Sequence, residues 1–471
     1  MKTYRFQVPL VVLSLFGLLT SCSDFLEQSP KSYQNVENFY KTLPEMEEAI
    51  NGALDAMQSY KQYGGNFIFF MEVRADNTTE ESFTSSGGIY GDFDLFREIP
   101  TNQILSPTWA SCYQTISQCN IVLDRIANIN GEEAEKNKYV GEALFLRALT
   151  YFNMVRIWGD VPLILHEVDD PFKAFDYERT PKDEVYKQIV EDLEKATPLL
   201  PLASKTKKGL PTSGAAATVL GEVYLTLHEY GKALVPLKAV LDSKEYKLMK
   251  TYAELFDPSN KNTSESIFEI QYNGNIDGEG SRFANMFAPK SSKEVTGGIG
   301  KTLGDNIPTD EFYASFEKGD VRRDITIGVL KDLRKYCKKF VKAPAIAEQS
   351  DANFIVYRLA DVYLMYGEAL NETGDTKGSL YYINKIRSRA GLSNLTTTDK
   401  LELREAYLNE RRHELGCENH RWFDLLRTGK AISVMNAVEG KDYNVEEYKL
   451  LFPIPQRELD ASDKMTQNPK Y

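Results

Sequence analysis

Apolar residues recur at helical spacing over much of the chain, and this pattern restricts the fold more than any other feature. Within residues 138–158, for example, Leu144, Ala148, Tyr151 and Val155 recur at the spacing of one helix face. Similar patterns cover further segments, namely 109–129, 181–227, 230–241, 354–390 and 401–427. The sequence therefore predicts a mainly α-helical protein.

Two of the predicted helix pairs share a spacing of small residues and turns. Gly-Glu-Val-Tyr at 221–224 and Gly-Glu-Ala-Leu at 367–370 are each followed by a tight turn and then by a second helix. Small residues where two helices cross are typical of tetratricopeptide hairpins, which bury their apolar stripes by stacking on a neighbour. We expect a tetratricopeptide-like framework of helical hairpins over about 109–245 and 354–430, interrupted by insertions.

Two long stretches lack the helical pattern. Residues of about 60–106 and 256–350 are rich in Gly, Asn, Asp, Ser and aromatic side chains, with a short strand expected at 266–270. Long irregular segments inserted into a rigid helical scaffold usually carry function. We therefore expect a single domain over 22–471, partly β in its insertions, with the ligand-binding face on the two insertions.

The first residues have the features of a lipoprotein signal peptide. Lys2 and Arg5 precede the uncharged stretch 6–20, which is shorter than the ~20 residues that a spanning helix needs, and Cys22 stands at its exit. Cleavage after a leader of 1–21 and acylation of Cys22 would anchor the chain, at about 0.8 kcal/mol per buried methylene. The alternative is a soluble signal peptide followed by an ordinary cysteine.

The balance of charges restricts the class of partner. The formal net charge is −12, with 42% hydrophobic and 26% charged residues. A globular chain of this composition has no general basic face, which nucleic acid or an anionic lipid surface would require. We expect no nucleic-acid partner, and a membrane association only through the lipid anchor.

Four cysteines remain beside Cys22. They are Cys112, Cys119, Cys337 and Cys417. Cys112 and Cys119 lie on one predicted helix about 10 Å apart at ~1.5 Å per residue, which exceeds the ~7 Å limit for bridged Cα atoms. We interpret them as buried thiols.

Several motifs resemble those of the SusD/RagB family of Bacteroidetes nutrient-binding lipoproteins. They follow in the order of the family: Cys22 with 25–27, then 142–148, the Gly-Asp-x-Pro-Leu turn at 159–163, 358–364, 383–387, 411–415, 421–427 and 452–455. These motifs cover both ends and the middle of the chain. The charged residues of 410–427 have helical spacings that permit ion pairs, which indicates a structural role.

The resemblance implies a tetratricopeptide-like body that docks on a SusC-like TonB-dependent outer-membrane barrel. It also implies an irregular face that holds an oligosaccharide and a lipid-anchored position on the outer membrane, facing the cell exterior. The expected function is the non-catalytic binding of an oligosaccharide nutrient and its delivery to the transporter. No cofactor is expected, and the sequence leaves open whether a structural calcium ion orders the loops.

Three alternatives stay open. One is a peptide-binding, RagB-like uptake lipoprotein, and another is a lid or scaffold whose barrel partner holds the specificity. The third is a surface glycosidase, which requires two carboxylates facing each other across a cleft.

The motifs that could carry catalysis or hold a metal are incomplete. Gly-Lys-Thr at 300–302 resembles the end of a phosphate-binding loop, but Val295 stands where the first glycine is required. His413, Cys417 and His420 offer two or three ligands at most, without an evident fourth. We therefore expect no catalytic and no metal-binding residues.

Aromatic rings that stack on sugar faces, with polar groups beside them, are the expected binding chemistry. All three tryptophans lie on predicted helices, so Tyr and Phe of the insertions would provide the rings. The expected ligand-binding residues are Tyr63, Phe67, Arg74, Asp76, Asn77, Tyr90 and Phe93 in the first insertion, and Tyr272, Asn273, Arg282, Phe283 and Phe287 in the second.

Some of these positions are favoured over others. Tyr63, Tyr90, Tyr272 and Phe283 are preferred because Gly, Asn or charged residues flank them, and Tyr60 is a further ring of the first insertion. The competing interpretation is that many of the rings are core, as the apolar run at 67–70 suggests. Arg282 suits a carboxylate of an acidic sugar or of a peptide equally well.

Overall fold

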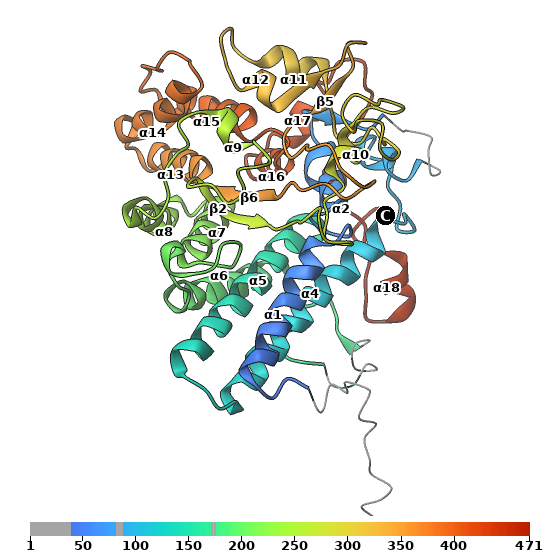
Figure 1. The fold of residues 1–471 in the computed structure, drawn as a ribbon, viewed down its shortest axis with the longest axis vertical. Helices are drawn as coiled ribbons and strands as arrows, with labels where there is room; N and C mark the ends of the chain where they lie inside the picture. Colours follow the sequence, from blue (N-terminus) through green and yellow to red (C-terminus); the bar gives the residue numbers. More distant parts are fainter. Residues whose placement is uncertain (1–38, 82–87, 169, 171–172, 174–175) are drawn as a thin grey trace, which may run out of the picture.

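The computed structural model describes residues 39–81, 88–168, 170, 173 and 176–471. The chain is mainly helical (Figure 1), which confirms the predicted fold class. The predicted leader at 1–21 and the predicted lipidation site Cys22 lie outside the described residues. A membrane-crossing helix is not found in the part of the chain that the structure describes.

A continuous stack of helices forms the framework. Its members, in order along the stack, are α1 (Leu43–Gln58), α4 (Leu105–Arg125), α5 (Glu133–Trp158), α6 (Lys182–Leu199), α7 (Ser213–Thr226), α8 (Tyr230–Ser243), α13 (Leu359–Thr373), α14 (Thr376–Arg389) and α15 (Lys400–Leu415). Each packs on the next, and α8 packs directly on α13 although a long irregular segment separates them in sequence. In Figure 1 the stack extends from α1, α4 and α5 to α14 and α15.

Small residues allow the helices to approach closely, as the sequence pattern predicts. Gly221 of α7 faces Leu237 of α8, and a methyl group added to Gly221 would overlap the Leu237 side chain. Gly367 of α13 faces the Tyr407 ring of α15 in the same way. These contacts let each hairpin bury its apolar stripe against its neighbour.

The two insertions contain short elements and meet through a strand pair. The first holds α2 (Asn66–Ile68), η2 (Phe69–Val73), β1 (Thr78–Thr79) and α3 (Gly91–Asp94). The second, which extends in the structure from the end of α8 to the start of α13, holds α9 (Tyr252–Leu255), β2 (Ser266–Ile270), α10 (Phe283–Phe287), β3 (Ile307–Pro308), α11 (Asp310–Ser315), α12 (Arg323–Thr326), β4 (Ile327–Val329), β5 (Lys335–Cys337) and β6 (Phe354–Arg358). Antiparallel pairs form between β2 and β6 and between β4 and β5, while β1 pairs with β3 and so joins the two insertions.

Aromatic residues of the first insertion extend the core of the framework. Phe70 is fully buried and contacts Trp158 at the end of α5 with ring centroids 5.7 Å apart. Phe452 packs on the Phe70 ring with centroids 4.8 Å apart. The insertion is therefore anchored to the framework by its own apolar side chains.

Four short elements follow α15 and complete the chain. They are α16 (Arg421–Arg427), α17 (Ala431–Met435), η7 (Glu447–Leu450) and α18 (Gln456–Ala461).

Buried ion pairs connect the C-terminal helices to the rest of the fold. Glu414 of α15 accepts from Arg358, Arg322 and Arg389, and all of these side chains are nearly inaccessible. Burial alone would raise the pKa of Glu414, but the three guanidinium groups hold it well below its usual range. Within 410–427 itself, Asp424 pairs with Arg427 three residues away and with Arg411, each at 2.8 Å, so the expected ion pair at helical spacing is present.

The four described cysteines are free and buried. Burial raises the pKa of Cys119 to about 12. The interpretation of Cys112 and Cys119 as buried thiols is confirmed.

Candidate ligand-binding site

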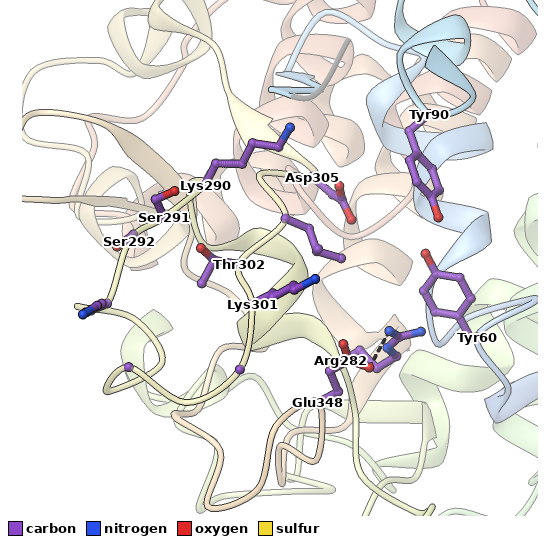
Figure 2. Close-up of a pocket in the computed structure, with 14 residues that line it drawn as sticks. Tyr60, Tyr90, Arg282, Lys290, Ser291, Ser292, Lys301, Thr302, Asp305 and Glu348 are labelled. Carbon is purple, nitrogen blue, oxygen red and sulfur yellow. Dashed lines mark hydrogen bonds and ion pairs between the residues drawn. The ribbon is translucent and has the colours of Figure 1, made fainter. Parts of the chain in front are cut away.

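A cavity of about 610 Å³ lies where the two insertions meet. Tyr60 and Tyr90 of the first insertion form one wall, and the glycine-containing loop 290–303 of the second insertion forms the opposite wall (Figure 2). Arg282 and Glu348 close one end. The cavity is therefore bordered by two aromatic rings and by charged side chains.

Protein groups hold both tyrosine rings in place. The Tyr90 ring stacks on Phe69 with centroids 4.9 Å apart and an interplanar angle of 30°. The Arg282 guanidinium lies over the Tyr60 ring, 4.4 Å from its centroid. Figure 2 shows the two hydroxyl groups pointing toward each other. Burial and then the proximity of Tyr90 and Asp305 raise the pKa of Tyr60, so its hydroxyl stays neutral and can donate to a ligand.

Arg282 is fixed between an aromatic ring and a carboxylate. Its Nη2 donates to Glu348 Oε2 at 2.5 Å, and both side chains are partly exposed. Its Nε finds no hydrogen-bond acceptor among the described residues. Because Nε is buried, a ligand in the cavity can be reached only by the terminal nitrogens of the group.

Two buried carboxyl groups lie at the inner side of the cavity. The chain continues from β1 into Glu80, which hydrogen-bonds Asp305 just before β3. Burial raises the pKa of Asp305 well above its usual range, although the Glu80 hydrogen bond and the charges of Arg282 and Lys290 oppose this effect. Asp305 therefore keeps a proton at mildly acidic pH and can act as a hydrogen-bond donor.

Asn285 holds two walls of the cavity together. Its Nδ2 donates to the carbonyl oxygens of Ile299 and Lys301, both at 2.9 Å. Its Oδ1 accepts from the amide of Glu348 at 3.0 Å. Asn285 is buried, with 1% of its surface exposed. This one amide therefore fixes the backbone of the 290–303 loop relative to Glu348 before any ligand binds.

The structure brings two of the expected ligand-binding residues together in this cavity. Tyr90 and Arg282 approach from different insertions and both border it. Asn273 lies elsewhere, in a turn where its Oδ1 accepts from the amide of Asn275 at 3.0 Å. The half-exposed Asn273 therefore serves the turn.

Six expected rings are placed in the interior instead of on the ligand face. They are Tyr63, Phe67, Phe93, Tyr272, Phe283 and Phe287. The Tyr63 hydroxyl accepts from Asn153 of α5 at 2.9 Å, and Tyr272 meets Phe283 edge to face at 5.5 Å. Burial of the apolar area of these rings stabilises the insertions.

Three expected polar residues of the first insertion form interior contacts with the framework. Arg74 makes a buried ion pair with Glu98 at 2.7 Å. Asp76 accepts a hydrogen bond from Arg421 of α16, and Asn77 accepts one from Arg412 of α15. Their expected contact with a ligand is not supported, because the polar groups face buried charged partners.

Several cavity residues were missed by the sequence analysis, namely Lys290, Lys301, Asp305 and Glu348. Tyr60, which also borders the cavity, was named as a ring of the first insertion but not among the expected ligand-binding residues. The signal that could have identified the loop is the Gly-Lys-Thr sequence at 300–302. Gly298 and Gly300 have φ values of 83° and 73°, so the loop needs glycine to follow this path.

Neither a metal centre nor a phosphate-binding loop is formed by the motifs considered for them. Within the described ranges, no group of three or more His, Cys, Asp or Glu side chains is placed to hold a metal ion. His413 instead lies 3.1 Å from the Ser315 hydroxyl through its Nε2. Gly-Lys-Thr at 300–302 lies in an irregular loop and not at a helix start.

Known proteins share this fold and sequence. A profile of the SusD family matches residues 331–471, and a profile described as "Starch-binding associating with outer membrane" matches residues 24–225. SusD-like protein P2 of Formosa agariphila is 28% identical and aligns over 100% of both chains. A laminarin-binding SusD-like protein has a TM-score of 0.80 at 28% identity, over 92% of this chain and 100% of that one.

A further structure supports the fold alone. A SusD superfamily protein of Bacteroides vulgatus has a TM-score of 0.82 at 23% identity, over 92% of this chain and 100% of that one. The helical stack with a cavity between two insertions defines a tetratricopeptide-like scaffold protein. The chain belongs to the SusD/RagB family, as its motifs predict.

Proposed function

We propose that the protein binds an oligosaccharide at the cell surface without cleaving it and delivers it to a SusC-like TonB-dependent outer-membrane transporter. Cys22 would carry the lipid that anchors the chain to the outer membrane, facing the exterior. The observation that carries the proposal is the wall of Tyr60 and Tyr90, whose rings Arg282 and Phe69 hold beside a cavity of about 610 Å³.

The chemistry of the cavity suits a sugar. Aromatic rings stack on the C–H faces of sugar rings, while neutral hydroxyl and carboxyl groups pair with sugar hydroxyls. The laminarin-binding relative, at 28% identity, supports a glycan as the ligand class.

Binding is favoured over hydrolysis by the state of the two cavity acids. Glu348 is held in an ion pair by Arg282, and Asp305 is hydrogen-bonded to Glu80 behind it. A glycosidase needs one ionised and one protonated carboxyl group free to face the scissile bond. Here both groups are engaged by other protein groups.

Isothermal titration against neutral and acidic oligosaccharides and mixed peptides tests the proposal. Saturable glycan binding is expected, weakened by Tyr60→Ala or Tyr90→Ala by about 1–3 kcal/mol for a lost stacking ring. Tyr381→Ala is the matched control, because Tyr381 is 55% exposed on α14, away from the cavity. Binding of peptides alone would replace the proposal with peptide uptake, and release of shorter sugars would establish hydrolysis.

A further inference from the structure

The cavity has the opposite charge balance to the whole chain. The protein has 56 Lys and Arg against 68 Asp and Glu residues, giving a net charge of −12. The cavity is bordered by four cationic side chains, Arg282, Lys290, Lys293 and Lys301, and by two acidic ones, Asp305 and Glu348. Concentrated positive charge in a concave site on an acidic protein attracts an anionic ligand.

The buried acids of the cavity offset this positive charge only in part. Asp305 is 2% exposed and hydrogen-bonded to Glu80, and burial raises the pKa of Asp305 to about 7, so the pair carries less than its full charge of −2 near neutral pH. Arg282 and Lys290 both act on Asp305 electrostatically, which places their charges near the inner end of the cavity.

Lys301 is positioned for a ligand and not for a protein partner. Asn285 fixes its backbone carbonyl, and Figure 2 shows its side chain directed across the cavity toward Tyr60. Neither Lys301 nor Lys293 has an ion-pair partner within the described part of the chain. A lysine aimed into a cavity in this way gains most from an anion supplied by the ligand.

Arg282 supplies the complementary geometry. Its guanidinium lies over the Tyr60 ring, 4.4 Å from the ring centroid, and its Nη2 donates to Glu348, so its terminal nitrogens lie at the cavity while its Nε is buried. A planar donor group of this kind pairs with carboxylate or sulfate oxygens better than with a neutral hydroxyl.

We propose that the ligand of this cavity is an anionic oligosaccharide, carrying uronic-acid carboxylates or sulfate esters, whose anionic group binds between Arg282 and Lys301 while a sugar ring contacts Tyr60 or Tyr90. This inference rests on the proposed function, because it specifies the class of glycan. Carboxylate and sulfate are both oxyanions that pair with the two cations in the same way. The test therefore uses a separate probe for each.

Titration calorimetry of the purified protein with paired probes tests the inference. One pair is an oligogalacturonate and the same oligomer with its carboxyl groups methyl-esterified. The other is a sulfated galactan oligosaccharide and its desulfated form. We expect one charged probe to bind at least about tenfold more tightly than its neutral partner, with weaker binding when the salt is raised from about 0.05 M to about 0.3 M.

Lysine variants locate the charge that is recognised. Lys301→Gln should weaken binding of the charged probe about fivefold, and Lys301→Arg should largely restore it. Lys377→Gln, an exposed position on α14, removes the same charge far from the cavity and should leave binding unchanged. Lys301 is itself exposed, so its substitution does not threaten folding.

The outcomes separate this inference from the proposed function. Equal binding of the charged and neutral members of both pairs, or binding of neutral glucans alone, would overturn the anionic specificity while glycan binding stands. Equal losses in Lys301→Gln and Lys377→Gln would overturn the assignment to this cavity. Absence of binding to any saccharide would overturn both proposals together.

Discussion

Asp76 and Arg421 form a bidentate buried ion pair although 345 residues separate them in sequence. Arg421 Nε lies 2.7 Å from Asp76 Oδ1, and its Nη2 lies 2.9 Å from Oδ2. Arg412 Nη2 reaches the same carboxylate at 2.9 Å. The pair connects the first insertion, which provides Tyr60 and Tyr90 to the cavity, to α16.

Removing one partner of this pair should strongly destabilise the protein. Arg421→Ala leaves the buried Asp76 carboxylate with Arg412 as its remaining cationic partner. We expect the free energy of unfolding to fall by about 3 kcal/mol. Urea unfolding followed by circular dichroism measures this change. Arg404→Ala is the control, because it breaks a pair in which the arginine is 44% exposed, and its cost should be within about 1 kcal/mol. Equal costs for both variants would contradict the structural role of the Asp76 pair.

The glycine at the crossing of α7 and α8 should resist substitution. Alanine favours the helix over glycine by about 1 kcal/mol, so propensity alone would make Gly221→Ala stabilising. The new methyl group, however, overlaps the Leu237 side chain. We expect a net destabilisation of about 1–2 kcal/mol from overpacking, measured by thermal or urea unfolding.

Gly231 provides the matched control for this substitution. It lies in α8, and no atom within 4 Å would meet an added methyl group. Gly231→Ala should therefore leave stability unchanged or raise it by up to about 1 kcal/mol. A stabilised Gly221→Ala variant would show that the helices do not pack as closely as described.

Stability should depend on pH through His413. Burial, together with the charges of Arg322 and Arg412, lowers the pKa of His413 to about 3. The unfolded histidine titrates near 6.5, so between pH 6.5 and 3 the unfolded state binds a proton that the folded state does not. This contribution to stability is therefore present above pH 6.5 and is lost as the pH falls toward 3.

Urea unfolding of the wild type and of His413→Gln at several pH values isolates this effect. The stability difference in favour of the wild type should shrink by about 2 kcal/mol between pH 6.5 and pH 4.5. Carboxylates that titrate in the same range affect both proteins equally. Parallel stability curves would show that His413 is able to take up a proton in the folded state.

The described thiols should be protected in the folded protein. Cys417 is hydrogen-bonded to Cys337, and this bond and burial raise the pKa of Cys417. In a Cys22→Ser variant, a thiol reagent such as dithionitrobenzoate should react slowly under native conditions and label four cysteines after unfolding. Labelling of only two cysteines in unreduced, unfolded protein would reveal a disulfide.

The sequence predicts the framework because local spacing and packing agree there. Leu144, Ala148, Tyr151 and Val155 repeat at helical intervals, and all four are buried in α5. Gly221 was identified as a helix-crossing residue for the same reason, since the small residue and the turn after it lie within one hairpin. Motifs of the family lie in this framework, so the family could be recognised before the structure was known.

The candidate site could be predicted only in part. Tyr90 and Arg282 were expected and both border the cavity, but Glu348 lies more than 40 residues after Lys301 and Asp305 in the second insertion, and no sequence pattern links them. The two insertions meet through the pairing of β1 with β3, which follows no periodic sequence pattern. Their composition indicates a ligand-binding face without indicating which side chains reach it.

Tyr60 and Tyr63 show what the sequence determined and what the tertiary structure decided. The sequence alone places both rings beside a glycine turn at the start of the first insertion. In the fold, the Tyr63 hydroxyl meets Asn153 inside the core, while the Tyr60 ring lies against Gly65, is covered by Arg282 and borders the cavity. Helical periodicity is a local property that the sequence carries directly. The direction of a loop side chain is set by whichever distant surface packs against it, and that is determined only when the whole chain has folded.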